Sequence, residues 1–316
     1  MANGAFIKFE RIKILMLTIA YDPIYAHPLP EGHRFPMLKY ELIPGQLLHE
    51  GIITEANLFS PQPIEEDIIL RTHVAHYWHR MKAGQLTAKE MRAIGFPQSG
   101  VLVERERIIT KGTINCALNA LQCGVSLNGA GGTHHAFADH GEGFCLLNDF
   151  AIASNYLLDN KIAGKILITD LDVHQGNGTA SIFQNDDRVF TFSMHGEHNY
   201  PFHKEKSDLD IGLPDKTSGD EYLRILQQTL PGLIEKVKPD FMCFVAGVDV
   251  LSTDKFGKLN LTLDDCKHRD EIVFTLCKQH HIPIAVAMGG GYSPDIKDIV
   301  EAQCNTYKVA KDVFGL

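Results

Sequence analysis

The sequence predicts an α/β fold in which a central parallel sheet is covered by helices on both faces. Short, continuously apolar runs alternate along the chain with longer stretches whose apolar residues recur with a helical period. Strands buried on both faces are typically unbroken apolar runs, and alternation of strands with helices is typical of parallel sheets. No Pro-, Gly- or Ser-rich linker and no internal repeat divides the 316 residues, so we expect one domain spanning 1–316.

The apolar runs give the expected strands, and helical periodicity gives the expected helices. The strands are expected near residues 12–19, 54–59, 124–128, 165–169, 188–193, 240–246 and 282–288. The helices are expected near residues 37–50, 66–82, 104–122, 148–159, 219–237, 262–280 and 293–312. The run from Lys13 to Ala20 is also the candidate secretion signal, but it lacks a small-x-small cleavage pattern. We therefore expect it to form the first core strand.

Composition and charge exclude several classes of protein. The chain is 44% hydrophobic and 22% charged, which is typical of a globular protein with a large core. Its formal net charge of −9 argues against a general affinity for nucleic acid. No apolar run reaches the ~20 residues that span a bilayer, so no membrane partner is expected. Seven cysteines form no C-x-x-C pair, which predicts buried free thiols and a cytoplasmic location.

Polar clusters follow four of the expected strands at their carboxyl ends. In chain order, the residues of these clusters are His134 and His135, then Asp170, Asp172 and His174, then Asp249, and finally Tyr292. In open parallel sheets, ligands bind in the crevice beyond the carboxyl ends of the strands. We therefore expect these side chains to meet in one site.

Asp172, His174 and Asp249 are the expected metal ligands. Asp172 and His174 are two residues apart, so on an extended segment their side chains point to the same side. Two carboxylates and one imidazole leave a fourth position open for water or a substrate carbonyl, which is the arrangement of catalytic rather than structural zinc sites. Zinc is the expected metal, and ferrous iron is the alternative.

His134 and His135 are the expected acid/base pair. The double glycine before them lets the backbone turn tightly and approach a ligand closely. Asp170 and Asn177 are the expected hydrogen-bond partners, one for each ring, and such partners fix the tautomer of a histidine and raise its basicity.

Tyr292 follows the triple glycine 289–291. No G-K-[ST] comes after these glycines, which excludes a phosphate-binding P-loop. A phenol beside a metal can donate a hydrogen bond to a developing oxyanion. We expect Tyr292 to have that role.

Together these motifs resemble the histone deacetylase family, from about Tyr21 to Tyr292. The resemblance is carried by the N-terminal loop 27–40 (H-P-x-x-E-G-H-R-F-P-M-x-K-Y), by G-T-H-H-A at 132–136, by G-F-C-x-x-N-D at 143–149 and by D-L-D-V-H-Q-G-N-G at 170–178. The short length, the stretch 94–97 (I-G-F-P) and the H-Q-G-N-G variant look most like the class IV branch and its bacterial relatives.

The resemblance implies the arginase/deacetylase α/β fold and the metal, acid/base and phenol roles given above. It implies that Phe144 and Tyr200 flank a narrow acyl-lysine tunnel and that Arg34 lines an internal channel. The glycines expected to contact the substrate are Gly143, Gly290 and Gly291. A structural potassium ion is also implied, held by Asp170, Asp172, His174, Ser193 and Met194.

The sequence departs from the family pattern at three places. Asn177 stands where a second aspartate often orients the histidine pair, so we expect a lower pKa for His135. No acid lies between Ala93 and Val103, where many relatives use an aspartate to clamp the substrate backbone. Lys255-Phe256 replaces a common Pro-Leu pair, and we expect Phe256 to reshape the pocket.

The expected reaction is metal-dependent hydrolysis of an N-acyl amide, with acetyl-lysine in a protein or peptide as the first candidate. His135 would take the proton of a metal-activated water, His134 would support it, and Tyr292 would share the oxyanion with the metal. A longer acyl-lysine, an acetylpolyamine or another small N-acyl amine remains open, as does a non-catalytic acyl-lysine binding module. An arginase-type ureohydrolase needs two manganese ions and more carboxylates, and Asp249 has no aspartate two residues later.

Overall fold

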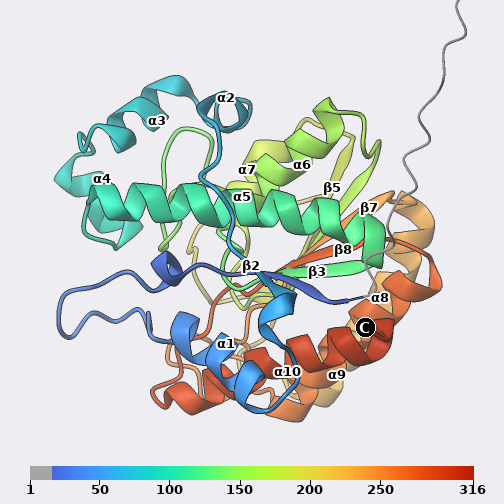
Figure 1. The fold of residues 1–316 in the computed structure, drawn as a ribbon. Coiled ribbons are helices and arrows are strands. Elements are labelled where there is room, and N and C mark those ends of the chain that lie inside the picture. The colour runs from blue at the N-terminus through green and yellow to red at the C-terminus, as the bar shows by residue number, and fades with distance from the viewer. Residues whose placement is uncertain (1–15) are drawn as a thin grey trace, which may run out of the picture.

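Within residues 16–316, which our computed structural model describes, eight parallel strands form one sheet in the order β2-β1-β3-β8-β7-β4-β5-β6 (Figure 1). The strands are β1 (Thr18–Ala20), β2 (Leu58–Phe59), β3 (Val125–Asn128), β4 (Ile166–Asp170), β5 (Val189–Gly196), β6 (Leu209–Leu213), β7 (Phe241–Val245) and β8 (Ile284–Ala287). Every neighbouring pair is parallel. The predicted α/β class with a parallel central sheet is confirmed.

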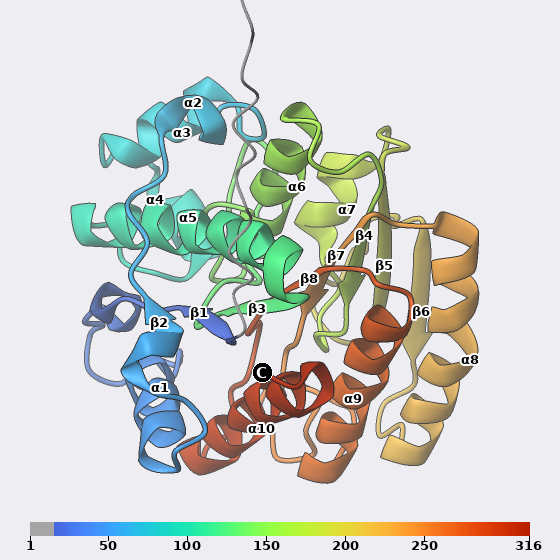
Figure 2. The same cartoon turned by 45° about the vertical axis from the view of Figure 1, so that its right-hand side comes forward.

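Helices cover both faces of this sheet (Figures 1 and 2). One face carries α5 (Gly100–Cys123), α6 (Asp149–Asp159) and α7 (Asn177–Phe183), with α2 (Glu66–Ile69), α3 (Ala75–Lys82) and α4 (Ala88–Ile94) outside α5. The other face carries α1 (Lys39–His49), α8 (Gly219–Val237), α9 (Leu263–Gln279) and α10 (Ile296–Phe314). Two short 3-10 helices, η1 (Pro23–Ala26) and η2 (Glu55–Asn57), lie in the N-terminal connections.

Capping residues explain where the longest helix begins and ends. The Ser99 hydroxyl accepts the backbone N–H of Leu102 at 3.0 Å, which satisfies a donor that the first turn of α5 leaves open. At the other end Gly124 has a φ of 93°, a conformation that glycine adopts without steric penalty. The chain then turns directly into β3.

Four central strands end at the same height, which positions the site. The register pairs Asn128 at the end of β3 with Ala287 on β8, Ala287 with Val245 on β7, and Val245 with Asp170 on β4. The loops that follow these strands therefore leave the sheet side by side at one edge.

The core is apolar, and its thiols are free. The residues of the central strands are almost completely buried between the two helical layers. All seven cysteines are unpaired, and six of them are buried, as predicted. Among residues 16–316, no helix combines the length and the apolar character needed to cross a bilayer.

The structure differs from the predicted elements at several places. The sequence did not predict α4, α7 or β6, and the expected helix 66–82 is divided between α2 and α3. β6 pairs only with β5, and its first four residues alternate between partial burial and exposure, so it lacks the continuous apolar run of a central strand. The first strand is confined to 18–20, and residues 12–15 of that prediction lie outside the described residues.

Phe244→Ala should strongly destabilise the protein. Phe244 is fully buried on β7, and its ring centroid lies 5.9 Å from that of Phe274 on α9. Removing such a ring costs about 3–5 kcal/mol of unfolding free energy, because a cavity remains. Phe202→Ala is the control: its side chain is 87% exposed, so the change should stay within about 0.5 kcal/mol. Urea unfolding measures both, and equal midpoints for the two variants would contradict this assignment of the core.

Candidate metal centre and active site

The three expected metal ligands meet at the carboxyl ends of β4 and β7. Nδ1 of His174 lies 3.0 Å from Oδ1 of Asp172 and 3.1 Å from Oδ2 of Asp249. All three residues are buried, and within residues 16–316 no other group of three or more His, Cys, Asp or Glu side chains has a ligand geometry of this kind. The segment carrying Asp172 and His174 is bent, not extended as expected. The bend still leaves both side chains pointing to the same place.

The geometry of this group fits a metal ion. A tetrahedral ion with bonds of about 2.0–2.1 Å separates its ligand atoms by roughly 3.3 Å, close to the observed separations. The other oxygen of each carboxylate is held by the backbone: Gly290 N–H donates to Oδ2 of Asp172 at 2.7 Å, and Val173 N–H donates to Oδ1 of Asp249 at 3.0 Å. One oxygen of each aspartate therefore faces His174. Oxygen and imidazole donors suit zinc and ferrous iron alike.

The electrostatics of the group also favour a cation. Burial opposes charge on His174, but its hydrogen bonds to Asp172 and Asp249 outweigh that effect and raise its pKa to about 10. Burial and the adjacent Asp172 charge raise the pKa of Asp249. The two buried carboxylates therefore favour a positive charge between them, which a divalent metal would supply.

Two glycines allow this close approach. A Cβ at Gly290 would lie 1.9 Å from Oδ2 of Asp249, and a Cβ at Gly247 would lie 2.2 Å from Oδ2 of Asp172. No side chain fits at either position while the carboxylates keep their places. The triple glycine before Tyr292 is therefore explained, in part, by the packing of the metal ligands.

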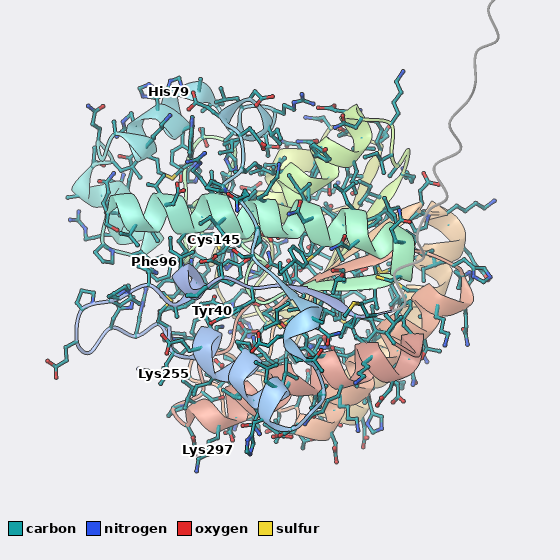
Figure 3. All side chains as sticks on the ribbon, in the orientation of Figure 1. Tyr40, His79, Phe96, Cys145, Lys255 and Lys297 are labelled. Atoms are coloured by element: carbon teal, nitrogen blue, oxygen red, sulfur yellow. The ribbon has the colours of Figure 1, made fainter. Side chains whose placement is uncertain are left out.

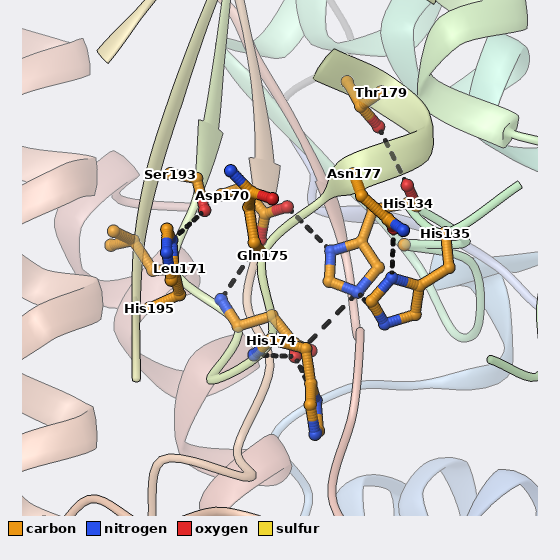
Figure 4. Close-up of polar contacts among 12 residues, drawn as sticks. His134, His135, Asp170, Leu171, His174, Gln175, Asn177, Thr179, Ser193 and His195 are labelled. Atoms are coloured by element: carbon orange, nitrogen blue, oxygen red, sulfur yellow. Dashed lines mark hydrogen bonds and ion pairs between the residues drawn. The ribbon is translucent and has the colours of Figure 1, made fainter. Parts of the chain in front are cut away.

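The adjacent histidines lie beside this centre with different partners (Figure 4). Nδ1 of His134 lies 2.7 Å from Oδ2 of Asp170, and Nδ1 of His135 lies 2.7 Å from Oδ1 of Asn177. Their Nε2 atoms are 3.1 Å apart. These are the two partners that the sequence predicted, one for each ring.

The two rings have opposite pKa shifts. Burial disfavours charge on His134, but the Asp170 and Asp172 carboxylates outweigh it and raise its pKa to about 9. Burial, followed by the charges of His134 and His174, lowers the pKa of His135 well below its usual value. The surroundings therefore favour a proton on His134 and disfavour one on His135.

Glu142 is a residue of the site that the sequence did not reveal. The Asn177 amide donates from Nδ2 to Oε1 of Glu142 at 2.5 Å, so its Oδ1 accepts the Nδ1–H of His135. The lone pair of His135 is then on Nε2. Burial, with a hydrogen bond to Glu142, also raises the pKa of the Tyr200 phenol. A carboxylate therefore lies one amide away from His135.

Aromatic rings form the walls above the metal centre. Phe144, Tyr200, Phe256 and Tyr292 line one pocket together with His135 and His174. The Tyr200 ring centroid lies 5.0 Å from that of His135, and Phe256 lies 5.1 Å from Tyr292. Gly143 also lines this pocket, and Gly290 lines the neighbouring inner cavity. Phe256 thus contributes to the pocket, as expected.

The end of α4 holds one of these walls in place. Phe144 has a φ of 68°, which is unfavourable for a residue with a side chain. Its N–H donates to the Ile94 carbonyl at 2.7 Å, and the Gly143 N–H donates to the Ala93 carbonyl at 3.0 Å. Gly95 follows, and a Cβ there would lie 2.9 Å from the Phe144 ring.

A small inner cavity of about 40 Å³ adjoins the metal centre, and Asp172 and His174 are part of its lining. Its lining includes Tyr40 from α1, Phe96 and Arg105, and Figure 3 shows Tyr40 and Phe96 in the region between α1 and α5. The prediction that Arg34 lines an internal channel is wrong, because Arg34 is exposed. Arg105, only 3% exposed, is the arginine inside. It comes from a helix far along the chain, so the N-terminal motif could not indicate it.

Lys39 is a second buried cation that the sequence did not reveal. It is fully buried, and its Nζ donates to the Gly289 carbonyl at 3.3 Å. The Nζ also lies 5.8 Å from the centroid of the Tyr292 ring. Burial lowers its pKa to about 8.

The residues expected around a potassium ion lie together behind the metal loop. The register pairs Asp170 on β4 with Ser193 on β5, next to Met194. The Ser193 hydroxyl lies 2.9 Å from Nδ1 of His195, which is buried in the interior (Figure 4). His198, by contrast, lines the outer pocket.

A parallel sheet with a buried Asp-His-Asp group at its carboxyl edge defines an α/β protein with a candidate metal centre. The family model described as the histone deacetylase domain matches residues 33–307, and this chain belongs to the histone deacetylase family. The crystal structure of the HDA15 HD domain covers 95% of this chain and 88% of its own, with a TM-score of 0.79 at 20% identity, which shows the shared fold.

The sequence is also similar to individual relatives. An uncharacterised protein from a Picosynechococcus species is 44% identical, covering 94% of this chain and 99% of that protein. Histone deacetylase 2 of Arabidopsis thaliana is 28% identical over 88% of this chain and 74% of its own length. Human histone deacetylase 1 is 27% identical over 89% of this chain, which spans 61% of the human protein.

Gly290→Ala should remove bound metal although every ligand remains. The new methyl group would lie 1.9 Å from the ligand oxygen of Asp249, so that carboxylate must move. Atomic emission after dialysis should show the same loss as in Asp249→Ala. Gly232→Ala is the matched control, because nothing lies within 4 Å of a Cβ at that position on α8. Stoichiometric metal in the Gly290 variant would contradict the ligand assignment.

Proposed function

We propose that this protein hydrolyses the amide of N-acylated lysine side chains, with acetyl-lysine as the main substrate. The observation that carries the proposal is the histidine pair beside the Asp-His-Asp group, with Nδ1 of His134 2.7 Å from Oδ2 of Asp170 and Nδ1 of His135 2.7 Å from Oδ1 of Asn177. An imidazole held by an amide can accept a proton, whereas one held by a carboxylate can carry positive charge and stabilise developing negative charge. The two neighbouring histidines thereby acquire separate chemical roles.

Asp172, His174 and Asp249 would hold the metal, which would polarise the amide carbonyl and acidify a water when bound. His135 accepts the proton of the attacking water at Nε2, because Asn177 fixes its hydrogen on Nδ1. It then delivers the proton to the leaving amine. His134, held by Asp170, supplies positive charge beside it. Tyr292 donates a hydrogen bond to the oxyanion. Its hydroxyl is available for this role, because within residues 16–316 it forms no hydrogen bond to another residue.

The dimensions of the inner cavity favour a short acyl group. A volume of about 40 Å³ is roughly three times the ~10–15 Å³ that one water needs. An acetyl methyl group fits that space, and a long acyl chain requires the walls to move. This supports acetyl-lysine over a longer acyl-lysine.

Further features support a finer assignment. The Asn177 variant and the stretch 94–97 support membership of the class IV branch. The pairing of Asp170 with Ser193 supports a structural potassium ion held by Asp170, Asp172, His174, Ser193 and Met194. The unpaired cysteines support a reducing, cytoplasmic location.

An acyl-chain series tests the proposal. Zinc- and iron-loaded protein is given acetyl-, hexanoyl- and myristoyl-lysine peptides and acetylated polyamines, and the released amine is measured. We expect the highest kcat/KM for acetyl-lysine. A preference for a polyamine or a long acyl chain would change the assigned substrate but leave the assigned reaction, amide hydrolysis, in place. Binding of acyl-lysine without turnover of any substrate would indicate a non-catalytic binding module.

His135→Ala should lower kcat by about 10²–10⁴, because the group that moves the proton is removed. Bound metal should stay stoichiometric, since His135 is not a ligand, and His134→Ala should be milder. Metal content and kcat are measured on the same samples. Near-normal kcat in His135→Ala would show that another group is the base.

Tyr292→Phe should lower kcat by about 10²–10³, equivalent to roughly 2.7–4 kcal/mol, because one oxyanion donor is lost. KM should change less, since this hydrogen bond strengthens as negative charge develops. The ring contacts with Phe144 and Phe256 remain in the variant. A rise in KM alone would make Tyr292 a packing residue of the pocket.

A further inference from the structure

The mouth of the pocket combines aromatic rings with cations and lacks acids. Its lining includes Arg34, Lys258 and His198 among the aromatic walls, and no Asp or Glu from the described residues. The chain as a whole carries 39 acidic and 30 basic residues. The positively charged side chains at the mouth therefore contrast with the net negative charge of the whole chain.

Arg34 is held by rings and not by an acid. Its Cζ lies 4.9 Å from the centroid of Phe144 and 5.7 Å from that of Phe256. Cation–π contacts of this kind position the plane of a guanidinium and leave the N–H groups at its edge available. Within residues 16–316 Arg34 forms no ion pair and donates no hydrogen bond. An exposed guanidinium held in this way suits a carboxylate, which it can bind through two parallel hydrogen bonds.

Lys258 adds a second positive charge to the same mouth. Its Nζ donates one hydrogen bond, to the His198 carbonyl at 2.9 Å, and two of its three N–H groups stay available. His198 is already partnered, with Nδ1 lying 3.3 Å from Oδ1 of Asp215. The charge at the mouth therefore comes from Arg34 and Lys258.

Nearby acids are occupied by other groups. Asp254 accepts the N–H groups of Phe256 and Gly257, each at 2.8 Å, and that of Tyr292 at 2.6 Å. Glu142 accepts from Asn177. Neither of them lines the mouth, so neither neutralises Arg34 or Lys258.

We propose that Arg34 and Lys258 form a binding subsite for a carboxylate of the substrate, next to the acylated amine. The inference rests on the proposed deacylase function and specifies its substrate class. The carboxylate can belong to an acidic residue beside the acyl-lysine, or it can be the α-carboxylate of a C-terminal or free acyl-lysine. The subsite replaces the acidic clamp that the stretch between Ala93 and Val103 lacks, and it repels polyamines.

Matched substrates test the subsite in the metal-loaded enzyme. Peptides amidated at the C-terminus carry acetyl-lysine flanked by Glu, Gln or Lys, and a second pair ends in acetyl-lysine with a free or an amidated carboxyl group. We expect kcat/KM to be about tenfold higher for the preferred carboxylate source than for its neutral match. The preference should shrink as salt is added, because the mouth is open to solvent. The first set reports on a flanking acid and the second on the α-carboxylate.

Substitutions then show which residues cause the preference for a carboxylate. Arg34→Gln and Lys258→Gln should each bring the ratio of kcat/KM for the acidic substrate to kcat/KM for its neutral match towards one. Lys255→Gln is the control: this exposed lysine lies beside Phe256 but does not line the mouth, so the ratio should persist. The salt dependence of the native enzyme tests the same charge without any substitution.

The outcomes separate the two proposals. Equal kcat/KM for acidic, neutral and basic substrates would overturn the subsite while leaving the deacylase function intact, as would a ratio unchanged in both Arg34→Gln and Lys258→Gln. If no peptide is turned over, the deacylase function fails. The same peptides labelled with a fluorophore then report on the subsite by anisotropy, where equal affinity for Glu and Lys peptides would overturn it.

Discussion

Burial of two aspartates around one histidine is the constraint on which the site depends. Carboxylates removed from water are destabilising by several kcal/mol each unless a positive charge and hydrogen bonds compensate. Here the compensation comes from His174, from backbone N–H groups of Val173 and Gly290, and, under the proposed function, from a metal ion. β4 and β7 end at the same height in the sheet. The loops that follow them can therefore bring Asp172, His174 and Asp249 together without bending the sheet.

The sequence predicted the sheet and the chemical groups at its edge, because both depend on local patterns. An apolar run marks a buried strand, and the residues that follow it mark the carboxyl edge. Glu142, Lys39 and Arg105 were missed because their roles arise from contacts between distant parts of the chain. Arg34 shows the same difficulty in reverse: its motif suggested an internal channel, but stacking on Phe144 and Phe256 keeps it at the surface.

The asparagine at 177 changes the character of the histidine pair. An amide fixes the orientation of His135 without adding a negative charge at Nδ1, and the Glu142 carboxylate lies beyond that amide. Asp170 by contrast touches His134 directly. Asp170 and Asp172 raise the pKa of His134, whereas burial and the charges of His134 and His174 lower that of His135, so two adjacent, equally buried rings have opposite pKa shifts.

The contact between α4 and Phe144 has a consequence for how selectivity can diverge in this fold. A pocket wall, Phe144, with an unfavourable backbone conformation is kept in place by two carbonyls at the end of a peripheral helix. That helix contributes no metal ligand or acid/base group, so its length and sequence can drift while the chemistry is retained. Under the proposed function, exchange of this helix between homologues is thus an evolutionary, and an engineering, route to a different pocket wall that leaves the metal ligands and the histidine pair unaltered.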